Sequence, residues 1–445
     1  MLIKLNRYLI ILILIFNILQ VNVTYSQSTI PLDPASTIPN EESSSSGINS
    51  PLQLNQIKQN EECFVPCDEI LRIQVKDAVT TLDDPKFVAL DNINAPNSRD
   101  KVLGVVVNGV SRAYPYDILR WHEIVNDIID GVHVSITYTD LTASGIAYLT
   151  SDLDNSELGY SGQVYENNLV FYDRISDSLF SQMGGIGLKG EKIEVSLQTT
   201  YAIETTMGTW QKLYPNTLVL SRDTGSNIDY ETFPYGYFSV GDTIFYQSRF
   251  NNDEFPYSLY KEKALTHVIK INNEVRLLPF SEIAILNYIN HNLNGKDVFT
   301  IFSLSDFSAI TYSRELDSGL SLEFSFYNDT GNLFDITQTL GQPLFIDNDQ
   351  KSIWNYKGIA ISGPLVGQKL NLIPSYNAYW YAASAYFPDA DIYTVKGIIP
   401  SNNTKLSTSG SSSNTQQIFY VSIFALISII VLSLFAYPRI KTKFF

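Results

Sequence analysis

Residues 102–138 have the sequence VLGVVVNGVSRAYPYDILRWHEIVNDIIDGVHVSITY, and this stretch decides the fold. Its apolar run 102–107 predicts a strand that ends at an Asn108-Gly109 turn, since these residue types accept tight-turn conformations. Pro115 predicts the first turn of a helix, where the missing N–H of proline costs nothing. β-branched and aromatic residues at 132–138 predict a further strand. The stretch therefore predicts strand, helix and strand.

The same pattern recurs later in the chain, which indicates an internal repeat. Turn-forming and aromatic residues keep their order at a shift of 164 residues and then at a shift of 173. The matched pairs include Asn108 with Asn272, Arg112 with Arg276, Pro115 with Pro279, Tyr148 with Tyr312, and Gly185 with Gly358. Late helices are expected at 205–213 and 375–386. We expect a β-rich α+β fold with two tandem homologous units, at 61–235 and 236–400.

Both ends of the chain carry apolar segments typical of targeting signals. Lys4 and Arg7 precede an uncharged run, and small residues near Ser26 offer a cleavage point, so a signal peptide is predicted at 1–26. An uncleaved signal anchor is the alternative, although the run is short for a membrane span. Residues 418–437 are uncharged and mostly apolar, which predicts one C-terminal transmembrane helix. A glycolipid-anchor signal is the alternative there, but three cations follow the apolar run.

The cations after residue 437 favour a cytoplasmic tail at 438–445 and place the bulk of the chain outside. Two segments rich in Ser, Asn and Gln flank the folded part. They predict a disordered leader at 27–60 and a flexible stalk at 401–417. The sequence therefore predicts a single-pass type I protein at the cell surface or in a secretory-pathway membrane, with the membrane as its partner.

The chain is acidic, with a formal net charge of −16. Without the predicted signal and tail it would hold 25 Lys and Arg against 46 Asp and Glu. Such a charge repels nucleic acid, so no nucleic-acid partner is expected. A solvated acidic exterior is the commoner reason for this balance.

Cys63 and Cys67 are the two cysteines of the chain. In an oxidising compartment such a pair usually forms a disulfide, and no histidine lies near them to suggest a metal site. We therefore predict a disulfide and no metal. Asn328 and Asn402 begin glycosylation sequons.

Several motifs carry a resemblance to a known family. They are Tyr114-Pro115, the segment 121–127, Thr137-Tyr138, Tyr172-Asp173-Arg174 and Ser181-Gln182. Over roughly 100–395 the chain resembles the bacterial and archaeal family known as domain of unknown function 3179. The resemblance implies no activity. That family often has Cys-Pro after the Thr-Tyr pair, where this chain has Thr139-Asp140, so thiol chemistry is not expected here.

The segment 121–127 offers candidate functional side chains. A helical projection continued through this segment places His122 at the edge of the apolar face and Glu123 and Asp127 on the opposite side. The zinc-protease pattern His-Glu-x-x-His is absent. Leu286 stands at the position of His122 in the second unit, which favours a buried structural histidine over a functional one.

Asp173 and Arg174 follow a strand-like run at 169–172. Such a pair can bind an anion or act as acid and positioner, and it can equally fix a turn as an internal ion pair. We take His122, Asp173 and Arg174 as candidate catalytic residues at the edge of a concavity in the first unit. Ligand binding is assigned to Glu123, Asp127, Tyr138 and Gln182.

These residues leave two classes of function open. One is a membrane-anchored extracellular protein with a ligand or active site in the first unit. The other is a non-catalytic surface binding or structural protein. No phosphate loop or dinucleotide fingerprint is present in the sequence, so the cofactor is unknown.

Overall fold

The computed structural model describes residues 62–90, 96–236, 238, 241–251, 253–327 and 341–400. Several predictions lie outside the described residues. They are the signal peptide at 1–26, the leader at 27–60, the stalk at 401–417, the span at 418–437, the tail at 438–445, and both sequons, at Asn328 and Asn402.

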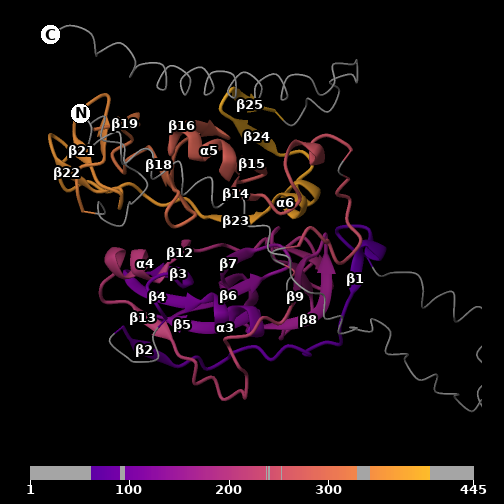
Figure 1. Ribbon diagram of the computed structural model, residues 1–445. Coiled ribbons are helices and arrows are strands. Elements are labelled where there is room, and N and C mark those ends of the chain that lie inside the picture. Colours follow the sequence, from indigo (N-terminus) through magenta and orange to yellow (C-terminus); the bar gives the residue numbers. More distant parts are fainter. Residues whose placement is uncertain are drawn as a thin grey trace, which may run out of the picture. The chain divides into compact units, whose positions relative to one another are not determined.

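The stretch quoted above forms five elements, and together with the strand that follows it they make a series of six that we call the first series (Figure 1). The series consists of β3 (Lys101–Val107), β4 (Val110–Pro115), α3 (Tyr116–His122), β5 (Ile124–Ile129), β6 (Val132–Thr139) and β7 (Ser144–Leu149). β3 and β4 form a hairpin around Asn108-Gly109, where both residues have positive φ as such turns require. A second hairpin, β5–β6, turns at Asp130-Gly131 in the same way.

The described residues from 62 to 220 form three sheets. The remaining elements are η1 (Cys67–Glu69), β1 (Ile70–Arg72), β2 (Phe87–Ala89), η2 (Ser151–Leu153), β8 (Leu158–Tyr165), β9 (Asn168–Asp173), β10 (Leu179–Ser181), β11 (Ile186–Lys189), β12 (Ala202–Thr206), α4 (Met207–Leu213) and β13 (Leu218–Leu220). The sheet orders are β12-β3-β4-β13-β2, β5-β6-β7 and β1-β8-β9-β10-β11. Only β13 pairs in parallel, with β4.

A second series follows the same order of elements. It consists of β14 (Leu265–Ile271), β15 (Glu274–Pro279), α5 (Phe280–Leu286), β16 (Tyr288–Leu293), β17 (Lys296–Ser303) and β18 (Ser308–Ser313). The other elements there are η4 (Tyr257–Leu259), β19 (Phe324–Phe326), β20 (Phe345–Asp347), β21 (Ile353–Trp354), β22 (Ala360–Ser362), β23 (Ser375–Tyr379), α6 (Trp380–Tyr386), β24 (Asp391–Thr394) and β25 (Gly397–Ile399).

The sheet orders of this part are β23-β14-β15-β24-β25, β16-β17-β18 and β19-β20-β21-β22. β24 pairs in parallel with β15, as β13 pairs with β4. The two series thus share element order and strand pairing. The division into homologous units at residues 235 and 236 stays a prediction.

The helix expected across the segment 121–127 ends earlier than the projection assumed. α3 ends at His122, and Glu123 caps it in the left-handed conformation with φ 54°. The β-branched residues of 124–129 then form β5, because the Asp130-Gly131 turn pairs them with β6. Likewise, 375–379 forms strand β23 rather than the start of a helix. The helical projection placed His122 at the edge of the apolar face and Glu123 and Asp127 on the opposite side of one helix. This prediction is therefore wrong.

The predicted fold class is also corrected. The described residues are β-rich, with four α-helices of seven residues each. Within them no helix is long and apolar enough to cross a membrane, because seven residues rise only ~10 Å. The C-terminal transmembrane helix, the membrane as partner and the single-pass type I localisation are not supported, and we withdraw them.

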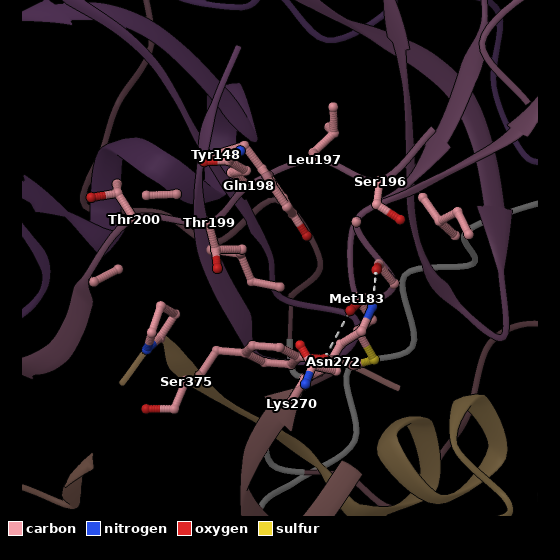
Figure 2. A pocket seen from close by; sticks show the side chains of 18 of the residues that line it. Tyr148, Met183, Ser196, Leu197, Gln198, Thr199, Thr200, Lys270, Asn272 and Ser375 are labelled. Carbon is pink, nitrogen blue, oxygen red and sulfur yellow. Dashed lines mark hydrogen bonds between the residues drawn. The ribbon is translucent and has the colours of Figure 1, made fainter. Parts of the chain in front are cut away.

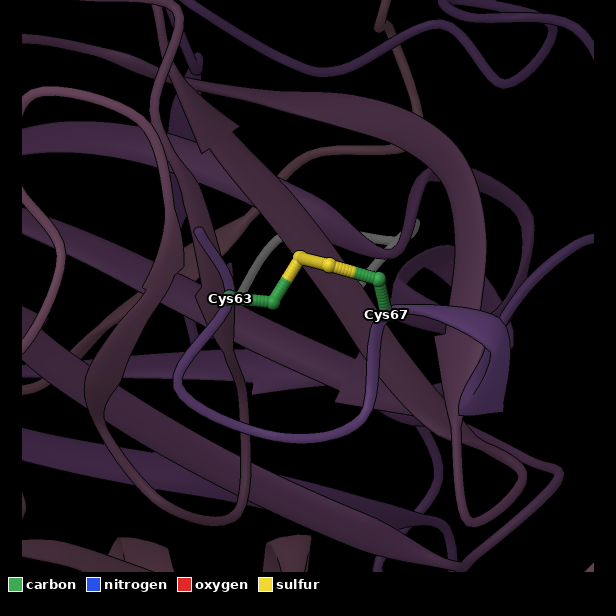
Figure 3. Close-up of a disulfide and its surroundings, with 2 residues drawn as sticks. All are labelled: Cys63 and Cys67. Carbon is green, nitrogen blue, oxygen red and sulfur yellow. A yellow bond between two sulfur atoms is a disulfide. The ribbon is translucent and has the colours of Figure 1, made fainter. Parts of the chain in front are cut away.

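The predicted disulfide is confirmed. Cys63 and Cys67 are bonded, with their Cα atoms 5.5 Å apart, at the start of the described chain (Figure 3). Phe64 N–H donates to Leu188 O, and Cys63 forms an isolated bridge with Lys189. These contacts hold the bonded loop against the β11 strand.

The core under α3 fixes the helix that carries most of the candidate site. Ile118 and Leu119 are fully buried against Leu103 of β3 and Ile136 of β6. Burial of each such side chain contributes roughly 1.5–3 kcal/mol, so the orientation of α3 is strongly determined. Its remaining side chains point to a cavity and to a buried polar cluster.

Candidate functional site

Glu123 is a buried carboxyl group held by the end of α3. Its N–H donates to Leu119 O at 2.7 Å, and its side chain is 3% exposed. One carboxyl oxygen, Oε1, accepts a hydrogen bond from the Tyr235 hydroxyl at 2.8 Å. Burial raises the pKa of Glu123 to about 8, against the Tyr235 hydrogen bond and with a further contribution from the Asp140 charge. Glu123 is therefore protonated in the folded protein at neutral pH.

Asp140 is the second acid of the same cluster. Tyr138 contacts both residues: its N–H donates to the backbone oxygen of Glu123 at 2.8 Å, and its hydroxyl donates to the carboxyl oxygen Oδ1 of Asp140 at 2.7 Å. Burial raises the pKa of Asp140, and Arg120 and Tyr138 oppose that rise. Two neighbouring carboxyls with raised pKa values are typical of sites that transfer protons.

Arg120 extends from α3 between this acid pair and solvent. Its side chain is 15% exposed, and its Nε lies 3.7 Å from Asp140 Oδ2. The guanidinium carbon lies 4.2 Å from the centre of the Phe233 ring. Within the described residues Arg120 makes no hydrogen bond, and its Nε is buried without a partner. A guanidinium carries five N–H donors, so most of them remain available.

Arg120 lines a cavity of about 550 Å³, which we call the α3 cavity. Its wall carries four cations, Arg99, Lys101, Arg120 and Arg222, and three acids, Asp100, Asp117 and Glu231. The aromatic residues Tyr116, Tyr230 and Phe233 complete one side.

The cations of the α3 cavity differ in how far they are neutralised. Arg222 pairs with both Asp117 and Glu231. Lys101 Nζ donates to the backbone oxygens of Asp306 and Phe307, and it lies 3.6 Å from Glu204 Oε1. Arg99 makes no ion pair or hydrogen bond with any other described residue. Arg99 and Arg120 are therefore the cations best able to bind an anion.

The Tyr116 hydroxyl is a second unsatisfied group at this wall. It is buried and meets no partner at hydrogen-bonding geometry in the described part of the chain. Burial and then the nearby Glu204 carboxylate raise the pKa of Tyr116 well above its ordinary value, so the hydroxyl stays protonated. A buried polar group without a partner costs roughly 1–3 kcal/mol, which a bound ligand could offset.

The three predicted catalytic residues do not line the α3 cavity. His122 is fully buried, its Nδ1–H donates to Thr80 O at 2.6 Å, and its Nε2 accepts from the Tyr230 hydroxyl at 2.7 Å. Burial lowers the pKa of His122, against the Thr80 hydrogen bond. These contacts fit a neutral structural histidine behind the wall residue Tyr230.

Asp173 and Arg174 form hydrogen bonds and ion pairs with neighbouring segments of the chain. The Asp173 carboxylate is buried and accepts from the N–H groups of Ile175 and Ser176, which fixes a turn. Arg174 donates to Asp83 at 2.9 Å and to Glu157 at 2.6 Å, and also to Thr81 Oγ1. No contact within the described residues joins His122 to either of them, although His122 and Arg174 bind the adjacent residues Thr80 and Thr81.

The four predicted ligand-binding residues divide into two groups. Glu123 and Tyr138 lie together in the acid cluster. Asp127 instead pairs with Arg112 and accepts from the Tyr114 hydroxyl at 2.5 Å. Gln182 is fully buried and bonds to Asn168, Ser144 and Thr137.

The sequence interpretation missed Arg120, Asp140 and Tyr235. Asp140 carried a signal, because it stands where the chain departs from the Cys-Pro of the family pattern. Tyr235 carried none, since its loop follows the cluster by about a hundred residues. No group of three or more His, Cys, Asp or Glu residues able to hold a metal occurs in the described ranges, so no metal is assigned.

Comparison with known proteins adds a family and no activity. No curated protein and no solved structure matches the chain. A family model described as "Protein of unknown function (DUF3179)" matches residues 76–390, which include α3, the acid cluster and both series of elements. Because the match covers well over half of the sequence, the chain belongs to the DUF3179 family.

Proposed function

We propose that the protein binds a small organic anion in the α3 cavity, with Arg120 as the principal contact. The observation that carries this proposal is the state of Arg120, which is largely buried at a cavity wall without a hydrogen bond to any described residue. A planar guanidinium matches carboxylate or phosphate oxygens in a two-point contact. In a chain of net charge −16, an under-neutralised cation in a cavity points to an anionic ligand.

The surroundings of Arg120 support a small molecule rather than a protein partner. A volume of about 550 Å³ lies in the range of small-molecule sites. The guanidinium carbon lies over the Phe233 ring, 4.2 Å from its centre, and Tyr116 offers a hydroxyl donor nearby. Arg99 supplies a second charge at the rim, where it is exposed to solvent.

A second candidate function is acid–base catalysis on the bound anion. The acid pair favours it, because Asp140 lies beside Arg120 and its charge contributes to the raised pKa of Glu123, which is about 8. A protonated carboxyl at neutral pH can donate a proton to a bound group. If the protein binds the anion without converting it, Glu123 and Asp140 have a structural role, and their raised pKa values keep the acid cluster neutral.

The test measures binding of citrate, succinate and inorganic phosphate by calorimetry. Arg120→Gln is compared with Arg72→Gln, which removes the same charge from an exposed arginine of β1. Loss of a charge-assisted hydrogen bond costs roughly 1.5–3 kcal/mol, so Arg120→Gln should weaken binding at least about tenfold. The control should bind as the wild type does. Binding of none of the three anions, or equal binding by both variants, would contradict the proposal.

A further inference from the structure

A second cavity lies away from α3, and we call it the Lys270 cavity (Figure 2). It has a volume of about 580 Å³. Its wall combines the end of β7, the loop 183–186, the segment 196–200, the β14–β15 turn and the start of β23. Figure 2 shows Lys270, Asn272 and Ser375 on one side, with Ser196 and Gln198 across from them.

Lys270 is the single charged residue of this wall. Its ammonium group donates to Gly184 O at 2.7 Å, which uses one of three N–H donors. Lys270 forms no ion pair with a carboxylate in the described residues, and no acid lines the cavity. Lys270 is exposed to solvent at this wall, so an anion can reach it and would be its first counter-charge among the lining groups.

Neutral polar side chains face the same space. Ser196, Gln198 and Asn272 line the cavity, and none of these three side chains makes a hydrogen bond to a described residue. Amide and hydroxyl groups both donate and accept, which suits ligand hydroxyl groups.

Two tyrosines supply an apolar part of the wall. The Tyr148 hydroxyl donates to Gln182 O, and the Tyr376 hydroxyl donates to Met183 O at 3.0 Å. Because both hydroxyls are bound to backbone oxygens, these residues offer mainly ring surface to the cavity. Ring surface beside amide and hydroxyl groups suits a compact molecule with both C–H and O–H groups.

We propose that the Lys270 cavity binds a small polyhydroxylated carboxylate, of the chemical class of a sugar acid. Lys270 holds the carboxylate, and Ser196, Gln198 and Asn272 hydrogen-bond to the hydroxyl groups. The site is independent of the α3 cavity, because the two share no lining residue.

The experiment titrates the full chain with galacturonate, galactose and acetate by ligand-observed and protein-observed NMR. Galactose lacks the charge, and acetate lacks the hydroxyl groups. We expect galacturonate to bind at least about tenfold more tightly than either, as expected when a charge-assisted contact and several hydrogen bonds act together. Equal binding of acetate and galacturonate, or no binding of galacturonate, would overturn the proposal.

Variants then locate the site. Lys270→Gln should weaken galacturonate binding about tenfold, and Lys270→Arg, which keeps the charge, should retain it within a few-fold. Lys296→Gln removes an exposed charge from β17 and should have no effect. Unchanged binding in Lys270→Gln would sink the assignment. Arg72→Gln, which changes an exposed arginine outside both cavities, should leave galacturonate binding unchanged. Protein-observed NMR shifts caused by galacturonate should fall on residues of the Lys270 cavity, whereas the α3 proposal is tested by Arg120→Gln with citrate, succinate and phosphate, so failures of the two proposals are distinguishable.

Discussion

Arg276 Nη1 donates a hydrogen bond to His291 Nδ1 at 3.0 Å. At the 164-residue register the same two positions in the first series are Arg112 and Asp127, which form an ion pair. An arginine can only donate, so Nδ1 of His291 must carry no proton. The two series therefore place different partners, one anionic and one neutral, against the same arginine position.

The arginine sets the direction of a longer chain of hydrogen bonds. His291 Nε2 lies 3.1 Å from Thr300 Oγ1, Thr300 lies 3.0 Å from Thr311, and Thr311 lies 3.1 Å from His267 Nε2. This series of hydrogen bonds ends at His267 Nδ1 and Asn377 Oδ1, which lie 2.8 Å apart. Each group can donate to the next only if both histidines are neutral.

The first prediction concerns the tautomers of these histidines. His291 should carry its proton on Nε2 and His267 on Nδ1, because Arg276 and the Asn377 oxygen fix the two ends. Burial, aided by Arg276, lowers the pKa of His291 to about 3, and burial lowers that of His267 to about 4 against the Asn377 hydrogen bond. Nitrogen-15 NMR of the rings should show both neutral at pH 6. A cationic ring of either histidine at that pH would contradict the proposed direction of the hydrogen bonds from Arg276 to Asn377.

The second prediction concerns stability above neutral pH. The folded pKa of Glu123, about 8, lies above its unfolded value near 4.5, so the folded state holds one more proton between these values. Its contribution is full below pH ~4.5 and is lost as the pH rises to about 8, at up to ~1.4 kcal/mol per pH unit. The free energy of unfolding of the wild type should therefore fall relative to that of Glu123→Gln between pH 6.5 and 8.

Urea unfolding of the wild type and Glu123→Gln across this range checks the prediction. The variant keeps a neutral side chain of the same shape, so its stability should lack this fall. Histidines with lowered folded pKa values raise the stability as the pH rises to about 7.5, because their unfolded forms, with a pKa near 6.5, still lose protons in that range. This rise is common to the wild type and the variant and cancels in the difference between them. Parallel curves for the two proteins would show that Glu123 is ionised in the folded state.

Local patterns predicted the strands better than the ends of the helices. The runs 102–107 and 132–138 became β3 and β6 because β-branched residues and Asn-Gly or Asp-Gly turns specify hairpins within a few residues. The end of α3 was missed because Glu123, a good helix former, adopts the left-handed conformation there. That conformation follows from the pairing of β5 with β6, which the helical projection did not consider.

The candidate site was harder to predict than the fold. Glu123 and Tyr138 were chosen from the motifs, and they do lie together, but their partner Tyr235 comes from a distant loop. The sequence around Arg120 gave no signal of a site, because the Phe233 ring that its guanidinium contacts lies more than a hundred residues later in the chain. The spacing of residues in the sequence indicates which side chains are neighbours on one helix or strand. The α3 cavity is instead lined by residues from several elements and loops.

The third prediction tests the packing that supports α4. Trp210 is fully buried, and a Cβ added at Gly104 would lie 2.2 Å from its ring. Gly104→Ala must therefore displace the indole, and overpacking of this kind costs about 1–3 kcal/mol or more. Gly341→Ala is a matched control, since nothing lies within 4 Å of the added methyl group. Thermal unfolding should show a loss for Gly104→Ala alone, and equal melting temperatures would contradict the packing described.

The last prediction separates the sequence-derived site from the α3 cavity. His122→Leu places in the first series the residue found at the matching position of the second, Leu286. It removes the hydrogen bond to Thr80 O, and a hydrogen bond of this kind contributes roughly 0.5–1.5 kcal/mol of stability. Arg174→Gln breaks half-exposed ion pairs and should cost less than about 1 kcal/mol.

Neither of these two variants should change anion binding by more than about twofold, whereas Arg120→Gln should lower it at least about tenfold. Tyr230 keeps its hydrogen bond to Thr224 when His122 is replaced, so the cavity wall should stay in place. Calorimetry with citrate, succinate and phosphate on all three variants gives the comparison. If His122→Leu or Arg174→Gln abolished binding while remaining folded by circular dichroism, the ligand would contact the residues that the motifs first indicated. If only Arg120→Gln did so, the binding contact is the Arg120 guanidinium, and His122, Asp173 and Arg174 stabilise the fold around it.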